Sequence, residues 1–100
     1  MILYNVTAIV DEEIHEDWLN WMREEHIRDV MNTECFVSNR LLRVLDSPNE
    51  GTTYCIQYIA ENKQNYDNYI KNFAPVLRSS FPERFNNKFV IFRTLMEVID

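Results

Sequence analysis

The first ten residues alternate between two sets of side chains. The predominantly apolar set comprises Ile2, Tyr4, Val6, Ala8 and Val10. The other set is mixed and comprises Leu3, Asn5, Thr7 and Ile9. A period of two is typical of a β-strand, because successive side chains point to opposite faces of a sheet. We therefore expect a strand over residues 2–10 with one apolar face.

After this strand, apolar residues recur at helical spacing, at Ile14, Trp18, Trp21 and Met22. They predict a helix over residues 11–31, with Asp11 as its N-cap and acidic side chains in its first turn. At about 100° per residue, His26 lies about 40° beyond Met22. This position places His26 at the edge of the buried stripe.

Three more strands and a second helix follow. Alternation and turn residues predict strands over residues 34–45, 52–61 and 88–98. The first two of these form a hairpin around the turn 46–51, which holds the only glycine of the chain. The second helix begins near Asn62, and Pro75 either kinks it or closes one helical piece and opens a shorter one.

The predicted order of elements is βαββαβ. In a chain of 100 residues, this order most simply gives one ferredoxin-like α+β sandwich over residues 1–100, with a four-stranded antiparallel sheet and two helices on one face. The sheet face without helices is too apolar for a monomer, so we expect a homodimer in which two such faces pack together. We expect this open face to carry Leu3, Asn5, Thr7, Ile9, Cys55, Gln57, Ile59, Phe89, Ile91, Arg93 and Leu95.

Charge and composition narrow the classes of partner. The net charge is −6 and the basic residues are scattered singly, so neither nucleic acid nor an anionic membrane is an expected partner. There is no apolar run of membrane-spanning length and no signal-peptide pattern, so we expect a cytoplasmic protein. In the predicted hairpin, Cys55 lies opposite about Leu42 rather than Cys35, and we therefore expect no disulfide.

The helix and the strand faces predict a candidate ligand cavity between helices and sheet. Its expected lining comprises Tyr4, Trp18, Met22, His26 and Tyr58, which would suit a flat aromatic or quinone-like ligand. His26 would then transfer a proton, since its unperturbed pKa lies near physiological pH. The alternative is that His26 is a core-edge histidine bonded to a carbonyl or carboxylate.

Other polar residues are predicted to have structural roles or to bind small ligands. Asn5, Thr7, Gln57 and Arg93 are expected between the two sheets of the dimer, where they would bind a small anion or form a network that fixes the register. Either the helix turns Glu25 and Asp29 outward, or these carboxylates pair with Arg40 or Arg93; we expect the salt bridge. Glu12-x-x-His15 has the spacing of a metal-ligand pair but lacks further ligands, so no metal and no cofactor is expected.

Several segments together resemble a known family. These are residues 1–7, the run Trp18-x-x-Trp21-Met22-x-x-x-His26, and residues 39–42, 54–58 and 89–95. They resemble the short bacterial proteins of the domain-of-unknown-function family numbered 4286. That family is similar to the dimeric α/β-barrel superfamily, which includes cofactor-independent monooxygenases, haem-degrading enzymes, lactone isomerases and non-catalytic members. The resemblance implies the fold and the dimer, but no particular reaction.

One residue departs from the family pattern, which has proline two positions after the histidine where this chain has Arg28. The helix can therefore continue past His26.

The sequence leaves two hypotheses for function. The first is a homodimeric protein for small-ligand binding or assembly. The second is a cofactor-independent monooxygenase- or isomerase-like enzyme that acts on a small aromatic substrate with His26 as acid/base.

Overall fold

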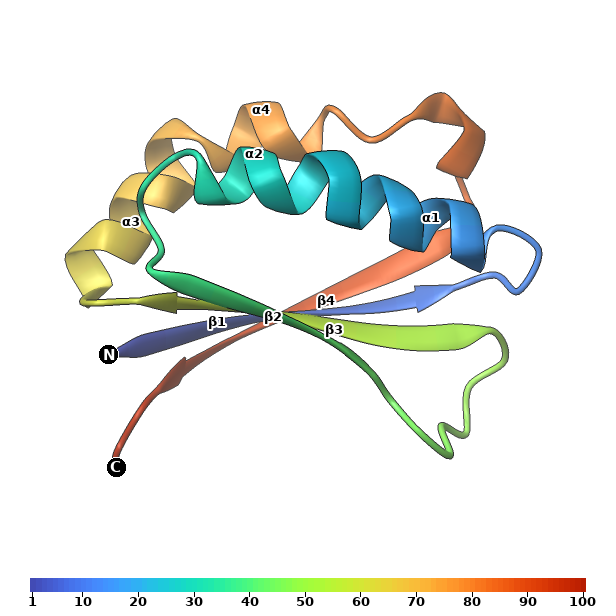
Figure 1. The fold of residues 1–100 in the computed structure, drawn as a ribbon, viewed down its shortest axis with the longest axis horizontal. Helices are drawn as coiled ribbons and strands as arrows, with labels where there is room; N and C mark the ends of the chain where they lie inside the picture. The colour runs from blue at the N-terminus through green and yellow to red at the C-terminus, as the bar shows by residue number, and fades with distance from the viewer.

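The computed structural model describes residues 1–100 as one antiparallel sheet covered on one face by helices (Figure 1). The strand order is β2-β3-β1-β4. The strands are β1 (Ile2–Val10), β2 (Ser38–Arg43), β3 (Thr52–Ala60) and β4 (Phe89–Glu97). The predicted α+β, ferredoxin-like arrangement is confirmed, with both helical segments on the same face of the sheet.

The first helical segment is one rod made of three pieces. They are α1 (His15–Trp21), the π-helical η1 (Met22–His26) and α2 (Ile27–Met31). The rod continues past Arg28, as expected from the absence of proline there. The prediction of Asp11 as N-cap is wrong, because a turn precedes the helix: the Asp11 carbonyl accepts a hydrogen bond from the Ile14 N–H at 3.1 Å.

The second helical segment divides where the sequence predicted. It consists of α3 (Lys63–Asn72) and α4 (Ala74–Arg78), and Pro75 lies in the first turn of α4. Proline is tolerated there because the first N–H groups of a helix have no intrahelical partner. The Asn62 side chain caps α3 by accepting a hydrogen bond from the Asn65 N–H at 2.8 Å. A short 3₁₀ turn, η2 (Glu83–Phe85), then leads into β4.

The hairpin of β2 and β3 is shorter than predicted. Glu34 and Asp46 have φ angles of 64° and 56°, and such left-handed backbone interrupts an extended strand. Within the hairpin, Leu42 pairs with Cys55 as expected, and both cysteines are free. The turn requires Gly51, because its φ is 85° and a Cβ there would collide with the Val10 carbonyl.

The register of β4 differs from the prediction. Val6 pairs with Arg93, and Tyr4 pairs with Leu95, so these partners share the helix-facing side of the sheet. The expectation that Phe89, Ile91, Arg93 and Leu95 lie on the open face is therefore wrong. The alternate residues of β4 lie on the open face instead, and these are Val90, Phe92, Thr94 and Met96.

The core lies between the sheet and the helices. Its largest fully buried side chains are Trp18, Tyr54, Phe85, Met22 and Ile56. At one end, Trp18 stacks on Tyr54 with ring centroids 5.6 Å apart. At the other end, Tyr4, Phe36, Tyr58, Tyr66 and Tyr69 form a second aromatic cluster. The cavity described below is lined by residues of this second cluster and of η1.

Candidate functional site

A small cavity lies between the sheet and the helical layer. Its volume is about 20 Å³, which is room for a single water molecule. The volume is too small for the flat aromatic ligand that the sequence suggested. It is lined by Tyr4, Val6, Met22, His26, Val30, Ile56, Tyr58, Tyr69, Arg78, Phe81, Ile91 and Arg93.

The structure brings together most of the predicted site residues. Tyr4, Met22, His26 and Tyr58 all line the cavity. Trp18 does not line it, because its fully buried indole stacks on Tyr54 at the other end of the core.

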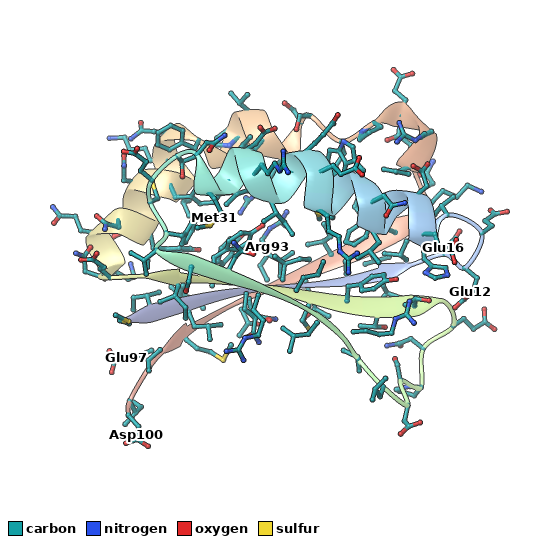
Figure 2. All side chains as sticks on the ribbon, viewed as in Figure 1. Glu12, Glu16, Met31, Arg93, Glu97 and Asp100 are labelled. Carbon is teal, nitrogen blue, oxygen red and sulfur yellow. The ribbon has the colours of Figure 1, made fainter.

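Arg93 joins this site from the helix-facing side of β4. It was expected between the two sheets, but its pairing with Val6 places it on the side of the sheet that the helices cover (Figure 2). The predicted polar set on the open face is therefore smaller. Asn5 donates a side-chain hydrogen bond to Thr7 at 2.9 Å, and Thr7 contacts the Cys55 sulfur at 3.5 Å.

The π-helical segment sets the position of His26. The Ile27 N–H donates to the Met22 carbonyl, five residues earlier. An i→i+5 turn holds more residues than an α-helical turn and so rotates His26 back toward the centre of the buried stripe. His26 is consequently only 9% exposed. Its ring lies 5.1 Å from that of Trp21 and 4.9 Å from that of Phe81, between centroids.

His26 is buried without a partner for its Nδ1 atom. The predicted bond to a carbonyl or a carboxylate is not formed at that atom. The pKa of His26 is lowered to about 4, chiefly by burial; the Asp29 charge acts to raise it, and the Arg93 charge acts to lower it. The imidazole is therefore neutral at pH 7. A buried polar atom without a hydrogen bond costs about 1–3 kcal/mol, so it requires an explanation.

Neither Glu25 nor Asp29 forms a salt bridge, and the predicted pairing with Arg40 or Arg93 is wrong. Both carboxylates are exposed because the helix turns them toward solvent.

Three tyrosines supply further polar atoms to the cavity lining. Burial raises the pKa of Tyr58 and of Tyr69, so both hydroxyls stay protonated at neutral pH. The Tyr4 hydroxyl accepts a hydrogen bond from Arg78 Nη2 at 3.2 Å. Tyr69, Arg78 and Phe81 were not predicted as site residues. Only Tyr69 had a signal in the sequence, because it lies on the apolar face of the second helix.

The exposed residues of the lining define its rim. Eight lining residues are buried, Phe81 and Ile91 are partly buried, and only Arg78 and Arg93 are exposed. The exposed part of the lining is therefore formed by Arg78 of α4 and Arg93 of β4. No aspartate or glutamate is among the lining residues.

A second polar cluster ties the start of α1 to the sheet. The Tyr54 hydroxyl lies 2.9 Å from His15 Nδ1 and accepts a hydrogen bond from Arg43 at 3.0 Å. His15 Nε2 lies 3.8 Å from a Glu12 carboxylate oxygen. His15 and Glu12 were considered above only as a metal pair, and no group of three or more His, Cys, Asp or Glu side chains is arranged to hold a metal ion.

Comparison with known proteins establishes the family. Residues 1–99 match the family described as "Domain of unknown function (DUF4286)", and the chain belongs to this family. The predicted family is thus confirmed. A search of curated proteins finds no match.

Several solved structures share the fold. A dimeric ferredoxin-like protein from an uncultured marine organism is 17% identical, with a TM-score of 0.72 over 100% of this chain and 96% of that chain. An ethyl tert-butyl ether D family protein from Bacillus halodurans is 10% identical, with a TM-score of 0.65 over 99% of this chain and 100% of that chain. A second dimeric ferredoxin-like protein from an uncultured marine organism is 13% identical, with a TM-score of 0.61 over 99% of this chain and 95% of that chain. At these identities the similarity shows the fold alone. None of the helices is both long and apolar enough to span a membrane.

Proposed function

We propose that this protein is a single-domain homodimer that binds a small molecule in the cavity beside His26. One observation carries the proposal: a histidine that is nine-tenths buried lines the cavity with Nδ1 unpartnered. A bound molecule that contacts this nitrogen would satisfy it and would recover the free energy lost on burial. The π-helical turn that directs the imidazole inward supports the same conclusion, because such turns are frequent at functional sites.

The size of the cavity restricts the ligand. The empty space accommodates one water-sized group. We propose that a compact molecule, or one small group of a larger molecule, enters between α4 and β4. The rest of a larger ligand would contact the rim, where Arg78 and Arg93 are exposed.

Acid–base catalysis by His26 has less support than binding. A general acid or base works best when its pKa lies near the working pH, whereas the pKa of His26 is about 4. A neutral imidazole at this site can donate or accept a hydrogen bond but is a weak base. The alternative of a monooxygenase- or isomerase-like enzyme therefore stays a prediction.

The open sheet face supports the homodimer. Val90, Phe92 and Met96 on β4 are 55%, 55% and 40% exposed there, and the neighbouring strands add Leu3, Ile9 and Leu42. Exposed apolar patches of this kind mark interfaces, and two of the similar structures are described as dimeric. Free cysteines support a reducing, cytoplasmic location.

Histidine NMR provides the test of ligand binding. The chain has two histidines, so the ring signals of His26 can be followed while those of His15 serve as an internal reference. Small neutral and charged probes, including acetamide, dimethyl sulfoxide, acetate and ammonium, are titrated in turn. We expect at least one probe to shift the His26 signals saturably and to leave His15 unchanged. The proposal fails if no probe does so.

A further inference from the structure

We infer that the group entering this cavity is a carboxylate, held by Arg93 and Arg78 at the rim and by the His26 N–H inside. The inference rests on the proposed function and specifies the chemical class of the ligand. It is drawn from three features of the site: its unpaired positive charge, its excess of hydrogen-bond donors, and its size.

The first feature is unpaired positive charge in an acidic protein. The chain has 16 acidic and 10 basic residues, and of the basic residues only Lys63, Arg84 and Lys88 form an ion pair with a carboxylate. Arg93 forms neither a salt bridge nor a side-chain hydrogen bond, and the only side-chain partner of Arg78 is the Tyr4 hydroxyl. Two cations without a carboxylate therefore border one opening.

The second feature is the polar chemistry of the lining. Arg78 and Arg93 are obligate donors, the neutral His26 ring carries one N–H, and Tyr58 and Tyr69 retain their hydroxyl protons. No side-chain carboxylate or amide is present to offer an acceptor. The unpartnered Nδ1 of His26 can be the N–H position of the neutral ring. An acceptor-only ligand group complements this set.

The negative charges near the site lie outside the cavity. Asp29 is the carboxylate that influences His26. Its side chain is exposed and borders a different groove, between α2 and the α3–α4 connection.

The third feature is size. A carboxylate is a planar group of three heavy atoms, and a guanidinium matches its two oxygens as a fork. One carboxylate oxygen is about the size of a water molecule and would occupy the observed space, while the other oxygen and the carboxyl carbon would lie toward the rim. The substituent of the carboxylate would then lie at the rim beside Phe81 and Ile91, which are partly buried and apolar.

The test compares acetate with acetamide, two probes of nearly equal size that differ in charge. Both are titrated at constant ionic strength while the His26 ring signals are followed. We expect acetate to bind saturably and acetamide at least about tenfold more weakly, because a charge-assisted hydrogen bond is lost. Equal binding of the two probes, or tighter binding of acetamide, would overturn the carboxylate inference while leaving the proposed function standing.

Substitutions then test whether Arg78 and Arg93 supply the positive charge that binds acetate. Arg93→Gln and Arg78→Gln should each raise the acetate Kd by about tenfold. Arg40→Gln is the matched control, because Arg40 is exposed on β2 and pairs with Gln57 on the open face; its acetate Kd should equal that of the wild type. Unchanged backbone spectra establish that each variant is folded. Wild-type affinity in both rim variants would exclude the arginines as the binding groups.

Discussion

The rings of Trp21 and His26 stack with their centroids 5.1 Å apart and their planes 29° apart, although five residues separate them along a helix. In a regular α-helix, residues five apart differ by about 140° around the axis and cannot face each other. The π-helical turn Met22–His26 reduces this difference. The stacked pair is thus the direct consequence of one local irregularity, which also places His26 at the cavity.

Stability should depend on the protonation of His26. Its pKa is lowered from 6.5 to about 4 in the folded state, so between these values the unfolded chain binds a proton that the folded chain does not. Stability attributable to His26 is therefore complete above about pH 6.5, falls as the pH drops toward 4, and is constant below that. The difference should amount to about 3 kcal/mol.

Urea unfolding of the wild type and of His26→Asn at several pH values measures this loss, because asparagine does not titrate. The unfolding free energy of the wild type should fall relative to that of His26→Asn as the pH falls from 6.5 to 4. His15→Asn is the control for the other histidine, which bonds to Tyr54. A pH-independent difference between wild type and His26→Asn would contradict the buried, neutral state of His26.

Trp18 should be required for stability and not for ligand binding. It is fully buried, stacks on Tyr54 and lies outside the cavity lining. Trp18→Ala should lower the free energy of unfolding by about 3–5 kcal/mol. Trp18→Phe, which retains more of the packing, should bind acetate like the wild type in the histidine NMR titration. Weaker acetate binding by a folded Trp18→Phe variant would show that Trp18 contributes to the binding site.

A charge on the open face should dissociate the homodimer. Phe92 is 55% exposed and lies on the sheet face opposite the helices. Phe92→Glu would place a charge at the proposed interface, opposite its own copy or other apolar side chains. Sedimentation of the wild type at micromolar concentration should show twice the 12.1 kDa chain mass, and that of Phe92→Glu should show the monomer.

The matched control for this variant is Val76→Glu. Val76 is 71% exposed on α4, which lies on the other side of the sheet. This substitution should leave the dimer intact. A wild-type protein that sediments as a 12.1 kDa species would exclude the dimer, whatever the variants do.

The Tyr54 hydroxyl should contribute to anchoring α1. This hydroxyl is hydrogen-bonded to His15 Nδ1 at 2.9 Å and accepts a hydrogen bond from Arg43 Nη2 at 3.0 Å. Tyr54→Phe removes both hydrogen bonds and leaves the aromatic stack on Trp18, so the free energy of unfolding should fall by about 1–3 kcal/mol. Thermal or urea unfolding measures the change. The acetate affinity of this variant should not change, because Tyr54 lies outside the cavity lining.

The amino-acid sequence by itself determined the order of elements and some of their boundaries. Alternation over residues 2–10, the start of the second helix near Asn62 and its interruption near Pro75 are local properties, and the structure confirms each. The pairing of Leu42 with Cys55 also followed from the position of the turn. The inward side of β1 was evident because only one of its two phases is consistently apolar.

Only the tertiary structure decided which way Arg93 and His26 point. Both phases of β4 mix apolar and polar residues, so alternation did not select its inward face, and pairing with β1 did so instead. The π-helical turn likewise has no signature in residue spacing, and Trp21 and His26 both pack against Phe81, which lies far away in the sequence. The sequence therefore identified His26 as the candidate, whereas long-range packing assembled the cavity and brought Arg78 and Arg93 to its rim.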